Sequence, residues 1–314
     1  MYGRSAIKDG MKGSREKIQI PKGHSFRVLR WNRSLREVAC ILGPGKSVKI
    51  AGEGAHWHFH PEMELTLFIS GEGTRFVGDH MGPFEAGDLL LLGGRLPHHW
   101  HTGGPTSGIS LQWHFPHSHP IWSLPETSEM MELFKSSDRG ILFTGETSQA
   151  AAGMLQAIGS ASGAMRLSRL LQVFAVLAKA PKSEHRQLSL RSFAIAADSH
   201  YQQAIARSIR HLIANFREPV RLEEVLNLTA LSRPTFARQF KQHAGLTFSA
   251  FLNRLRLQAA CQALTESNQS VMEIALACGF TQISFFNRLF LRMQGCSPSA
   301  FRQRQQSQRK GPQN

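Results

Sequence analysis

The stretch VMEIALACGFTQISFFNRLF, residues 271–290, decides the fold of the C-terminal part of this chain. Met272, Ile274 and Ala275 give a first short helix an apolar side, and the small Ala275 lets a second helix cross closely. Gly279 follows where the chain has to turn through a left-handed backbone conformation, which glycine adopts without steric cost. The stretch therefore predicts two short helices joined by a tight turn.

The second of these helices has a buried and an exposed side. Thr281 is expected to cap it, and Phe286 and Phe290 are spaced to lie together on the buried face. An ordinary helical hairpin inside a core is the alternative interpretation. The residues expected to point outward are largely polar and suit a DNA groove: Gln282, Ile283, Ser284, Asn287 and Arg288.

The same two-helix unit occurs twice, because residues 222–245 repeat the pattern. Thr247 begins a helix between the units, with a core face that runs from Phe248 to Ala259. A rigid connecting helix can set both units on one face of DNA, where successive major grooves lie about 34 Å apart. A shift of 50 residues places Phe236, Arg238, Phe240 and Gly245 on Phe286, Arg288, Phe290 and Gly295, and residues 249–251 on 299–301.

Polar side chains away from the phenylalanine stripes are the candidate DNA contacts. Arginine can donate two hydrogen bonds to guanine and glutamine can pair with adenine. Lys241, Arg254, Arg256 and Arg292 are expected to contact phosphates. For any single residue, a solvated surface position is the alternative interpretation. The candidate set is Ser232, Arg233, Thr235, Arg238, Gln239 and Gln242 in the first unit, and Gln282, Ser284, Asn287, Arg288 and Arg292 in the second.

The charge of the chain favours an anionic partner. Its 314 residues carry a formal net charge of +15, and the sequence pI is about 10.4. From residue 205 onward, 15 Lys and Arg stand against 5 Asp and Glu, whereas residues 37–135 hold 5 against 11. The basic excess accompanies the repeated unit and favours nucleic acid. A membrane surface is disfavoured, because no basic amphipathic helix accompanies the basic N-terminus.

Composition also excludes several classes of protein. No apolar run approaches the roughly 18 residues of a membrane span, and the N-terminus lacks the apolar core of a signal peptide. The cysteines include no Cys-x-x-Cys pair, so buried thiols in a reducing cytoplasm are expected rather than a disulfide framework. They are Cys40, Cys261, Cys278 and Cys296.

Short strands separated by Gly and Pro clusters fill residues 24–122, which predicts a β-sandwich or small barrel. Residues 1–23 before it are expected to form a flexible basic arm. Ten of the fifteen histidines fall between His56 and His119, so the β-domain concentrates imidazole groups. The expected strands are residues 26–32, 63–70, 74–79, 89–93 and 107–115.

The sharpest pattern of the β-domain is the motif G-x5-H-x-H-x3-E-x6-G at residues 52–71. His58 and His60 are two residues apart, so on a strand they point to the same side, and Glu64 continues that even-numbered face. His98 in a later segment can bring a fourth group across the barrel. Three imidazoles and one carboxylate form a complete ligand set for a divalent transition metal.

This motif resembles the first motif of the cupin superfamily and meets it at every position. The second cupin motif is met in part: Gly87 and His98 fit, but Thr102 replaces the family's Asn. A metal site, a metal-free effector pocket and a set of packed polar residues are the three interpretations. The candidate residues for both metal and effector are His58, His60, Glu64 and His98.

After the β-domain, residues 123–180 are predicted to be helical. A short helix is expected at 128–134, and a longer one at 149–179 carries a single apolar stripe. Packing against the β-domain and formation of a dimer interface are both open for this stripe. Residues 181–198 are expected to be the linker to a helical domain at 199–305, which is followed by a tail at 306–314.

Residues 205–304 resemble the AraC/XylS family of bacterial transcription regulators. The resemblance rests on G-F-T-x3-F-F-x-R-x-F in the second unit and on the G-x-S-P-S-A-F-R that follows. It implies seven helices with two helix-turn-helix units behind a cupin-like effector domain. It further implies a cytoplasmic, nucleoid-associated activator that binds double-stranded DNA and touches RNA polymerase, with a homodimer as the expected assembly. Ala230 departs from the family, which prefers Gly there.

The sequence therefore predicts a multidomain α and β chain: an N-terminal cupin-like β-sandwich or barrel with helices, then an all-α domain with two helix-turn-helix units. The favoured function is sequence-specific DNA binding that regulates transcription in response to a small-molecule or metal effector, without catalysis. The alternative is a metal-dependent cupin enzyme, a dioxygenase or isomerase, with an appended DNA-binding domain.

Overall fold

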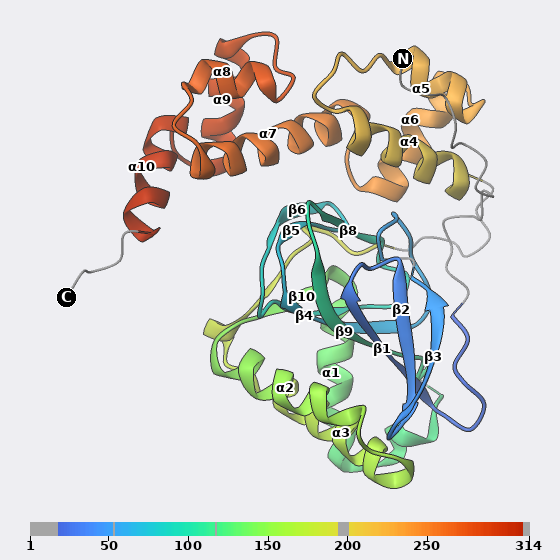
Figure 1. Cartoon of the computed structure of the whole chain (residues 1–314). Coiled ribbons are helices and arrows are strands. Elements are labelled where there is room, and N and C mark those ends of the chain that lie inside the picture. The colour runs from blue at the N-terminus through green and yellow to red at the C-terminus, as the bar shows by residue number, and fades with distance from the viewer. Residues whose placement is uncertain (1–17, 53, 117, 194–200, 310–314) are drawn as a thin grey trace.

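The structure is a computed structural model that describes residues 18–52, 54–116, 118–193 and 201–309 (Figure 1). A β-rich domain with three α-helices comes first, and an all-helical domain follows it. Most of the predicted arm, and the end of the predicted tail, lie outside the described residues. Within the described ranges, no helix has the length and apolarity needed to cross a membrane.

The first domain contains two antiparallel sheets, which confirms the predicted β-rich fold. The larger sheet has the order β11-β10-β7-β4-β9-β1-β2-β3, and the smaller has the order β6-β5-β8. Five of the strands match the predicted ranges closely, whereas β2, β3, β6, β8, β10 and β11 were not predicted. The bounds are β1 Phe26–Arg33, β2 Glu37–Gly43, β3 Lys46–Ala51, β4 Met63–Ser70, β5 Gly73–Val77, β6 His80–Phe84, β7 Leu89–Leu92, β8 His98–Thr102, β9 Thr106–Trp113, β10 Ile141–Phe143 and β11 His185–Gln187.

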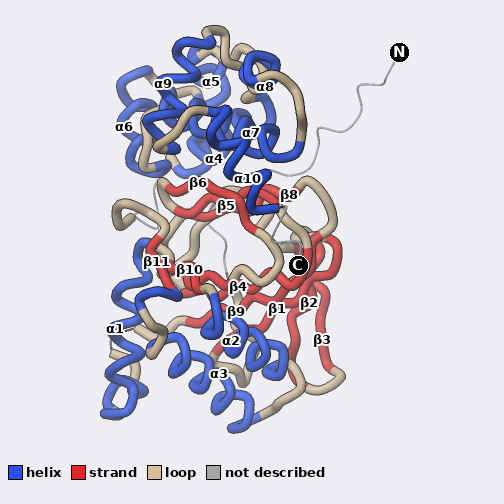
Figure 2. Tube along the Cα trace, turned by 90° about the vertical axis from the view of Figure 1, so that its left-hand side faces the viewer, coloured by secondary structure: helices blue, strands red, loops and turns tan. Residues whose placement is uncertain are grey.

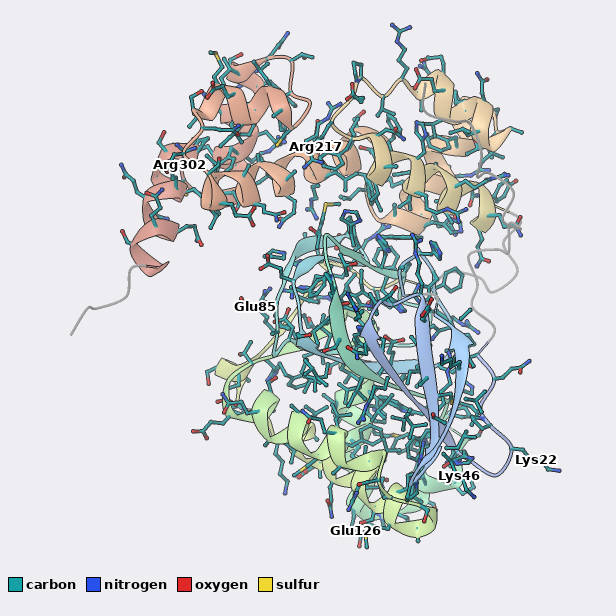
Figure 3. The ribbon with its side chains drawn as sticks, viewed as in Figure 1. Lys22, Lys46, Glu85, Glu126, Arg217 and Arg302 are labelled. Carbon is teal, nitrogen blue, oxygen red and sulfur yellow. The ribbon has the colours of Figure 1, made fainter. Side chains whose placement is uncertain are left out.

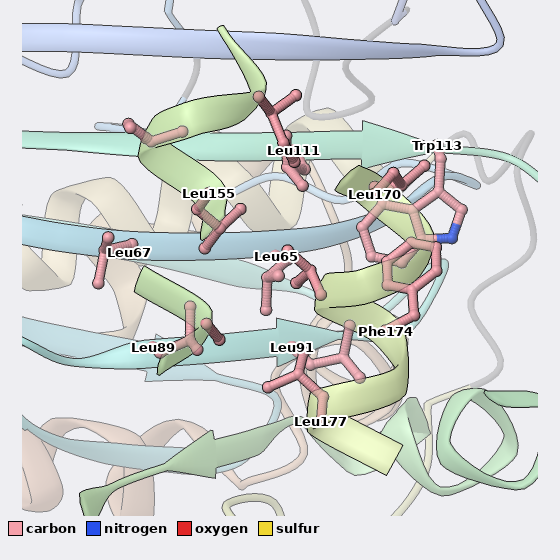
Figure 4. Close-up of a cluster of buried hydrophobic side chains, with 14 of the residues drawn as sticks. Leu65, Leu67, Leu89, Leu91, Leu111, Trp113, Leu155, Leu170, Phe174 and Leu177 are labelled. Atoms are coloured by element: carbon pink, nitrogen blue, oxygen red, sulfur yellow. The ribbon is translucent and has the colours of Figure 1, made fainter. Parts of the chain in front are cut away.

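Three helices cover the outer face of the larger sheet: α1 (Ser128–Ser136), α2 (Gly145–Ile158) and α3 (Gly163–Ala178). Figure 4 shows the core between them, where the helices place Leu155, Leu170, Phe174 and Leu177 against the strand residues Leu65, Leu89, Leu91, Leu111 and Trp113. The predicted apolar stripe of α3 therefore packs on the β-domain.

The single long helix predicted at residues 149–179 is wrong, because the chain forms two helices there. The first ends at Ile158, and the next begins at Gly163 behind an extended Ser162. Gly163 has a φ of +53°, in the left-handed region that an α-helix cannot continue through. The break lets the two helices fold back and pack on each other over the sheet.

A second core lies between the two sheets. The two sheets together are called the barrel below, and the space between them is its interior. Strand β7 is buried on both sides: Leu89 and Leu91 face the helices, whereas Leu90 and Leu92 face the space between the two sheets. This alternation follows from the two-residue period of a strand, and it explains why a run of four leucines forms a central strand. Strand β4 is covered in the same way, so its Glu64 points into the barrel.

The predicted linker is in part an element of the first domain. Strand β11 pairs with β10 at the edge of the larger sheet, and Leu188 and Phe193 beyond it are buried in the barrel core. The chain leaves the first domain only after Phe193, so the predicted boundary at residue 181 lies too early. Residues 194–200 of the predicted linker are outside the described part of the chain.

The second domain is all-helical, as predicted. Helix α7 runs across it, with α4 to α6 packed at one end and α8 to α10 at the other (Figure 1). At a rise of about 1.5 Å per residue its 19 residues span about 28 Å. The bounds are α4 Gln202–Asn215, α5 Leu222–Thr229, α6 Arg233–Ala244, α7 Phe248–Glu266, α8 Val271–Ala277, α9 Ile283–Gln294 and α10 Pro298–Arg309.

The two domains touch through the smaller sheet of the barrel. Strands β5, β6 and β8 face the helical domain in both views (Figures 1 and 2). Trp57 and Phe76 of the barrel belong to the same buried cluster as Phe251 of α7. The centroids of the Phe76 and Phe251 rings lie 6.3 Å apart with the rings nearly parallel. The first half of α7 therefore packs against both domains.

Candidate DNA-binding surface and barrel ligand site

The two units of the helical domain correspond in sequence and in the bounds of their second helices. Helices α6 and α9 begin and end 50 residues apart, and each ends at a left-handed glycine, Gly245 or Gly295. Phe236 and Phe240 in the first unit, and the matching Phe286 and Phe290 in the second, are at most 1% exposed. The repeat predicted from the sequence is thus a repeat of packed helix pairs.

The turns within the two units differ. Gly279 has the expected left-handed backbone, with a φ of +85°. The first unit places Ala230 in the same region, with φ 55° and ψ 31°. A left-handed backbone costs a residue with a Cβ about 1–2 kcal/mol. The turn of the first unit is therefore strained, whereas the glycine turn of the second unit is not.

The helix starts are partly as predicted. The side chain of Ser232 accepts a hydrogen bond from the Thr235 backbone N–H, so Ser232 caps α6 as expected. Thr281 does not cap α9, because the helix starts one residue later than predicted and its first residue follows Gln282. The sequence reading also missed Ser270, which caps α8 in a reciprocal pair with Glu273.

The apolar side predicted for the first helix of the stretch is right at two positions of three. Ile274 and Ala275 are buried against α9, but the Met272 side chain is 57% exposed. Met272 instead lines an open groove with Ile283 and Arg288 of α9. The outer surface of the second unit thus combines polar candidate residues with exposed apolar ones, which can contact the methyl group of thymine.

Ten of the eleven candidate DNA contacts are accessible. Gln239 is the exception, because it is only 9% exposed and lies on the buried side of α6 beside His243. It follows Phe236 by three residues, which places both on one helix face. The exposed or partly exposed candidates are Ser232, Arg233, Thr235, Arg238 and Gln242 on the first unit, and Gln282, Ser284, Asn287, Arg288 and Arg292 on the second.

Two arginines expected to contact phosphates bond within the protein. Arg254 donates to the backbone oxygen of Asp79 in the barrel, and Arg256 donates to the backbone oxygens of Phe216 and Glu218 at 2.7 and 2.9 Å. Arg254 therefore points toward the barrel, and Arg256 points toward the end of α4, rather than toward the outer surface. Lys241 and Arg292 are exposed, so two of the four predicted phosphate contacts are accessible.

The helical domain is basic, with 15 Lys and Arg against 5 Asp and Glu from residue 205 onward, and Figure 3 labels two of these arginines, Arg217 and Arg302. Arg217 is exposed beside α4, and the Arg302 guanidinium reaches the backbone oxygen of Gln269. This field attracts an anionic polymer and is weakened by salt.

Three of the predicted ligand histidines meet inside the barrel. The metal-ligand atoms of His58, His60 and His98 all lie within 4.8 Å of one another. His58 and His98 come from segments that pair through two backbone hydrogen bonds, 3.1 and 2.9 Å long. Each of the three side chains is at most 3% exposed. The fold therefore brings residues 40 positions apart in the sequence to one buried point.

Glu64 completes the cluster. Its Oε2 lies 3.3 Å from His60 Nε2 and 3.7 Å from His98 Nε2. Burial opposes ionisation of this carboxyl, but the adjacent His60 and His98 imidazoles outweigh burial and hold its pKa well below the usual value. Burial, together with the neighbouring His98 and His60, lowers the pKa of His58 well below its usual value.

The backbone orients all three imidazole rings. The Nδ1 atoms of His58, His60 and His98 lie 2.7 to 2.9 Å from the backbone oxygens of the residues at positions 56, 62 and 96. A ring that donates from Nδ1 to a carbonyl presents a lone pair at Nε2. Metal-bound histidines usually have their other ring nitrogen held by a hydrogen bond in this way, which fixes the orientation of the ring.

A chain of buried polar groups fixes the carboxylate. Gln112 donates to Glu64 Oε2 at 2.6 Å, Thr66 donates to Glu64 Oε1 at 2.5 Å, and Arg27 donates to the Gln112 amide oxygen. Gln112 and Arg27 lie on the neighbouring strands β9 and β1, at paired positions. Sequence reasoning missed all three residues: Gln112 and Arg27 come from other strands, and Thr66, two residues after Glu64 on β4, occupies an unspecified position of the motif.

The cluster fits a divalent transition metal. His98 Nε2 is buried and has no hydrogen-bond partner among the described residues, although Glu64 Oε2 is 3.7 Å away. A buried polar atom without a partner is costly unless something binds it. Three imidazoles and one carboxylate supply nitrogen and oxygen donors, a set that suits Fe, Ni, Co or Zn better than Ca or Mg.

A small cavity adjoins the cluster. It is lined by His58, Glu64, Ser110 and Gln112 on the polar side, and Trp100 is among its apolar walls. The volume of this cavity is about 30 Å³, which is room for about two water molecules. Pockets for drug-sized ligands occupy roughly 300 Å³ or more. This cavity therefore accommodates an ion with its water rather than a sugar-sized molecule.

Comparison with known proteins places the helical domain. Residues 225–304 match the family described as "Helix-turn-helix domain". The chain is 46% identical over 99 residues to the HTH-type transcriptional activator RhaS of Escherichia fergusonii, covering 30% of this chain and 36% of that protein. It is 42% identical over 118 residues to RhaS of Salmonella schwarzengrund, covering 38% and 41%. The chain thus spans about two fifths of the length of these relatives.

Solved structures resemble the chain more weakly. A probable AraC family transcriptional regulator from Rhodopseudomonas palustris is 31% identical, with a TM-score of 0.31, over 32% of this chain and 96% of that one. ToxT from Vibrio cholerae is 12% identical, with a TM-score of 0.33, over 89% and 98%.

The doubled helix pair and the sequence match define the class: the helical domain is a helix-turn-helix domain. Residues 225–304 match this domain family, and the motifs that resemble the AraC/XylS family lie within that range.

Proposed function

We propose that this protein is a transcription regulator that binds DNA through both helix-turn-helix units. The observation that carries the proposal is the doubled unit, in which Arg238 and Arg288 occupy equivalent exposed positions at the ends of one connecting helix. The basic field of the domain supports the same partner. Its relatives that bear the name RhaS are transcriptional activators, and activation is proposed here also.

Binding to a DNA site selected from a random library tests this proposal. Arg238→Ala and Arg288→Ala should each weaken binding by about 1–3 kcal/mol, or roughly 5- to 150-fold, because each loses a bidentate base contact. Lys46→Ala is a matched control, since it removes one exposed positive charge from β3 of the barrel. If both arginine variants bind the selected site like the wild type, the proposed contacts are wrong.

The effector of the regulator is proposed to be a divalent transition metal ion held by His58, His60, Glu64 and His98. The fit of the four donors, the unpartnered His98 Nε2 and the water-sized cavity support an ion over a sugar-sized effector. A metal bound only by the folded state raises the melting temperature. His58→Ala combined with His60→Ala should abolish that rise and the effector response, while leaving metal-free DNA binding intact.

The assembly and surroundings of the regulator follow from family resemblance. A homodimer in the bacterial cytoplasm, associated with the nucleoid when bound to DNA and in contact with RNA polymerase, is proposed. The buried residues of the α3 stripe are occupied by the β-domain, so a dimer would use other surfaces, such as the exposed Met165 and Leu167 of the same helix. Equilibrium sedimentation of the full chain tests the dimer.

Regulation rather than catalysis is proposed for the barrel. Turnover of any substrate by the metal-loaded protein would favour the alternative, a metal-dependent cupin enzyme.

A further inference from the structure

The barrel wall that carries the ligand histidines also forms the contact with the helical domain. The neighbours of two ligands face the opposite way: Trp57 precedes His58, and His99 follows His98. Both are buried, with 4% and 5% of their surface exposed. Because successive side chains of an extended chain point to opposite faces, a ligand on the inner face is adjacent to a residue on the outer face.

The outer residues pack against helix α7. The Trp57 ring lies edge-on to Phe251, with ring centroids 6.1 Å apart. The His99 ring lies 5.2 Å from Phe76, which in turn stacks on Phe251 at 6.3 Å. Phe251 is itself 2% exposed and packs against Phe240 of α6. Both ligand-bearing segments thus connect to one side chain of the helical domain, Phe251. Trp57 contacts it directly, and His99 contacts it through Phe76.

Polar contacts fix the same face. Arg254, one turn along α7 from Phe251, donates to the backbone oxygen of Asp79 at the turn between β5 and β6. The Asp79 carboxylate is held by the Ser189 hydroxyl and the Leu190 N–H, both at 2.9 Å. Arg191 donates to the backbone oxygen of Lys241 at 2.7 Å, at the end of α6. The docking of α7 therefore has defined apolar and hydrogen-bonded parts.

We propose that metal occupancy of the barrel site controls DNA binding by fixing this docked position of α7. An ion that joins His58 to His98 restrains both backbone segments, and with them Trp57 and His99. Since α7 carries a helix-turn-helix unit at each end, its docking sets how the two units are presented to DNA. The inference rests on the proposed function and adds the route by which the bound metal is read out.

The proposal requires a reciprocal coupling. If the metal changes the affinity for DNA by some factor, DNA must change the affinity for the metal by the same factor. Allosteric couplings of this kind typically amount to about 5- to 150-fold. A change of at least about fivefold in the DNA dissociation constant on metal addition is therefore expected for the wild type.

Full-length protein with Co²⁺ as the probe tests the proposal, because the visible absorption of the bound ion reports occupancy independently of DNA binding. Two variants weaken docking without touching a ligand: Arg254→Met removes the hydrogen bond to Asp79, and Phe251→Leu removes the aromatic stacking. Arg256→Met is the matched control on the same helix, since the hydrogen bonds of Arg256 within the described part of the chain go to backbone oxygens of the helical domain. The DNA dissociation constant is measured for each protein with and without Co²⁺.

The expected result is that both docking variants bind one Co²⁺ but that Co²⁺ changes their DNA affinity less than about twofold, whereas Arg256→Met keeps the wild-type response. If Arg254→Met and Phe251→Leu bind Co²⁺ and retain the full response, the proposed route is overturned while the barrel site stands. If wild-type protein binds no Co²⁺, the metal site itself fails, and the inference falls with it.

Discussion

Replacing Ala230 by glycine should stabilise the first helix-turn-helix unit. Ala230 has φ 55° and ψ 31°, a left-handed backbone that costs a non-glycine residue about 1–2 kcal/mol. Glycine removes that cost but gains conformational freedom in the unfolded chain, which offsets roughly 0.5–1 kcal/mol. The net gain for Ala230→Gly is about 0.5–1 kcal/mol.

Hydrogen exchange read by mass spectrometry resolves this gain, because peptides from α5 and α6 report the local opening of the first unit alone. A gain near the upper end slows exchange in these peptides by about fivefold. Peptides from α8 and α9 provide an internal reference, since the substitution touches neither helix. Equal or faster exchange in α5 and α6 of the variant would refute the assignment of strain to this turn.

The reverse change in the second unit sharpens the test. Gly279 has a φ of +85°, and a Cβ built there would lie 2.7 Å from the backbone oxygen of Phe216 and 2.8 Å from that of Arg217. Gly279→Ala therefore combines backbone strain with a clash against main-chain atoms that cannot rotate away. A loss of more than about 2 kcal/mol is expected, seen as exchange at least about 25-fold faster in α8 and α9.

Three further changes test the packing, the capping and the barrel site. Phe286→Ala should lower the free energy of unfolding of the helical domain by about 3–5 kcal/mol in urea titration, and a loss below about 1 kcal/mol would contradict its place in the core. Ser270→Ala should cost about 1 kcal/mol and speed exchange in α8 about fivefold, whereas unchanged exchange would argue against the capping pair. Gln112→Leu should weaken Co²⁺ binding about 10- to 100-fold in competition with a chelator, and wild-type affinity would show that the Gln112 hydrogen bond to Glu64 does not support the site.

The sequence predicted the repeated unit well because its signals are local. The phenylalanine pairs at i, i+4, and the glycines 50 residues apart, depend only on helix geometry. The same geometry also explains the error at Gln239. This residue lies three after Phe236 and four before His243, so the helix period places all three on the buried side.

The barrel site was predicted in part for the same reason. His58, His60 and Glu64 form a motif whose spacing is visible along the chain. Arg27 and Gln112 reach the site across strand pairings, and no spacing in the sequence indicates which strands become neighbours. The sequence also does not predict the contact of Trp57 with Phe251, because that contact depends on how two separate domains dock.

Mapping of base contacts on a selected DNA site, by methylation interference, tests most directly the claim that one chain reads DNA with two equivalent units. Two clusters of interfering bases about 10 base pairs apart are expected, one lost in Arg238→Ala and the other in Arg288→Ala. A single cluster, or two clusters that persist in both variants, would contradict the claim.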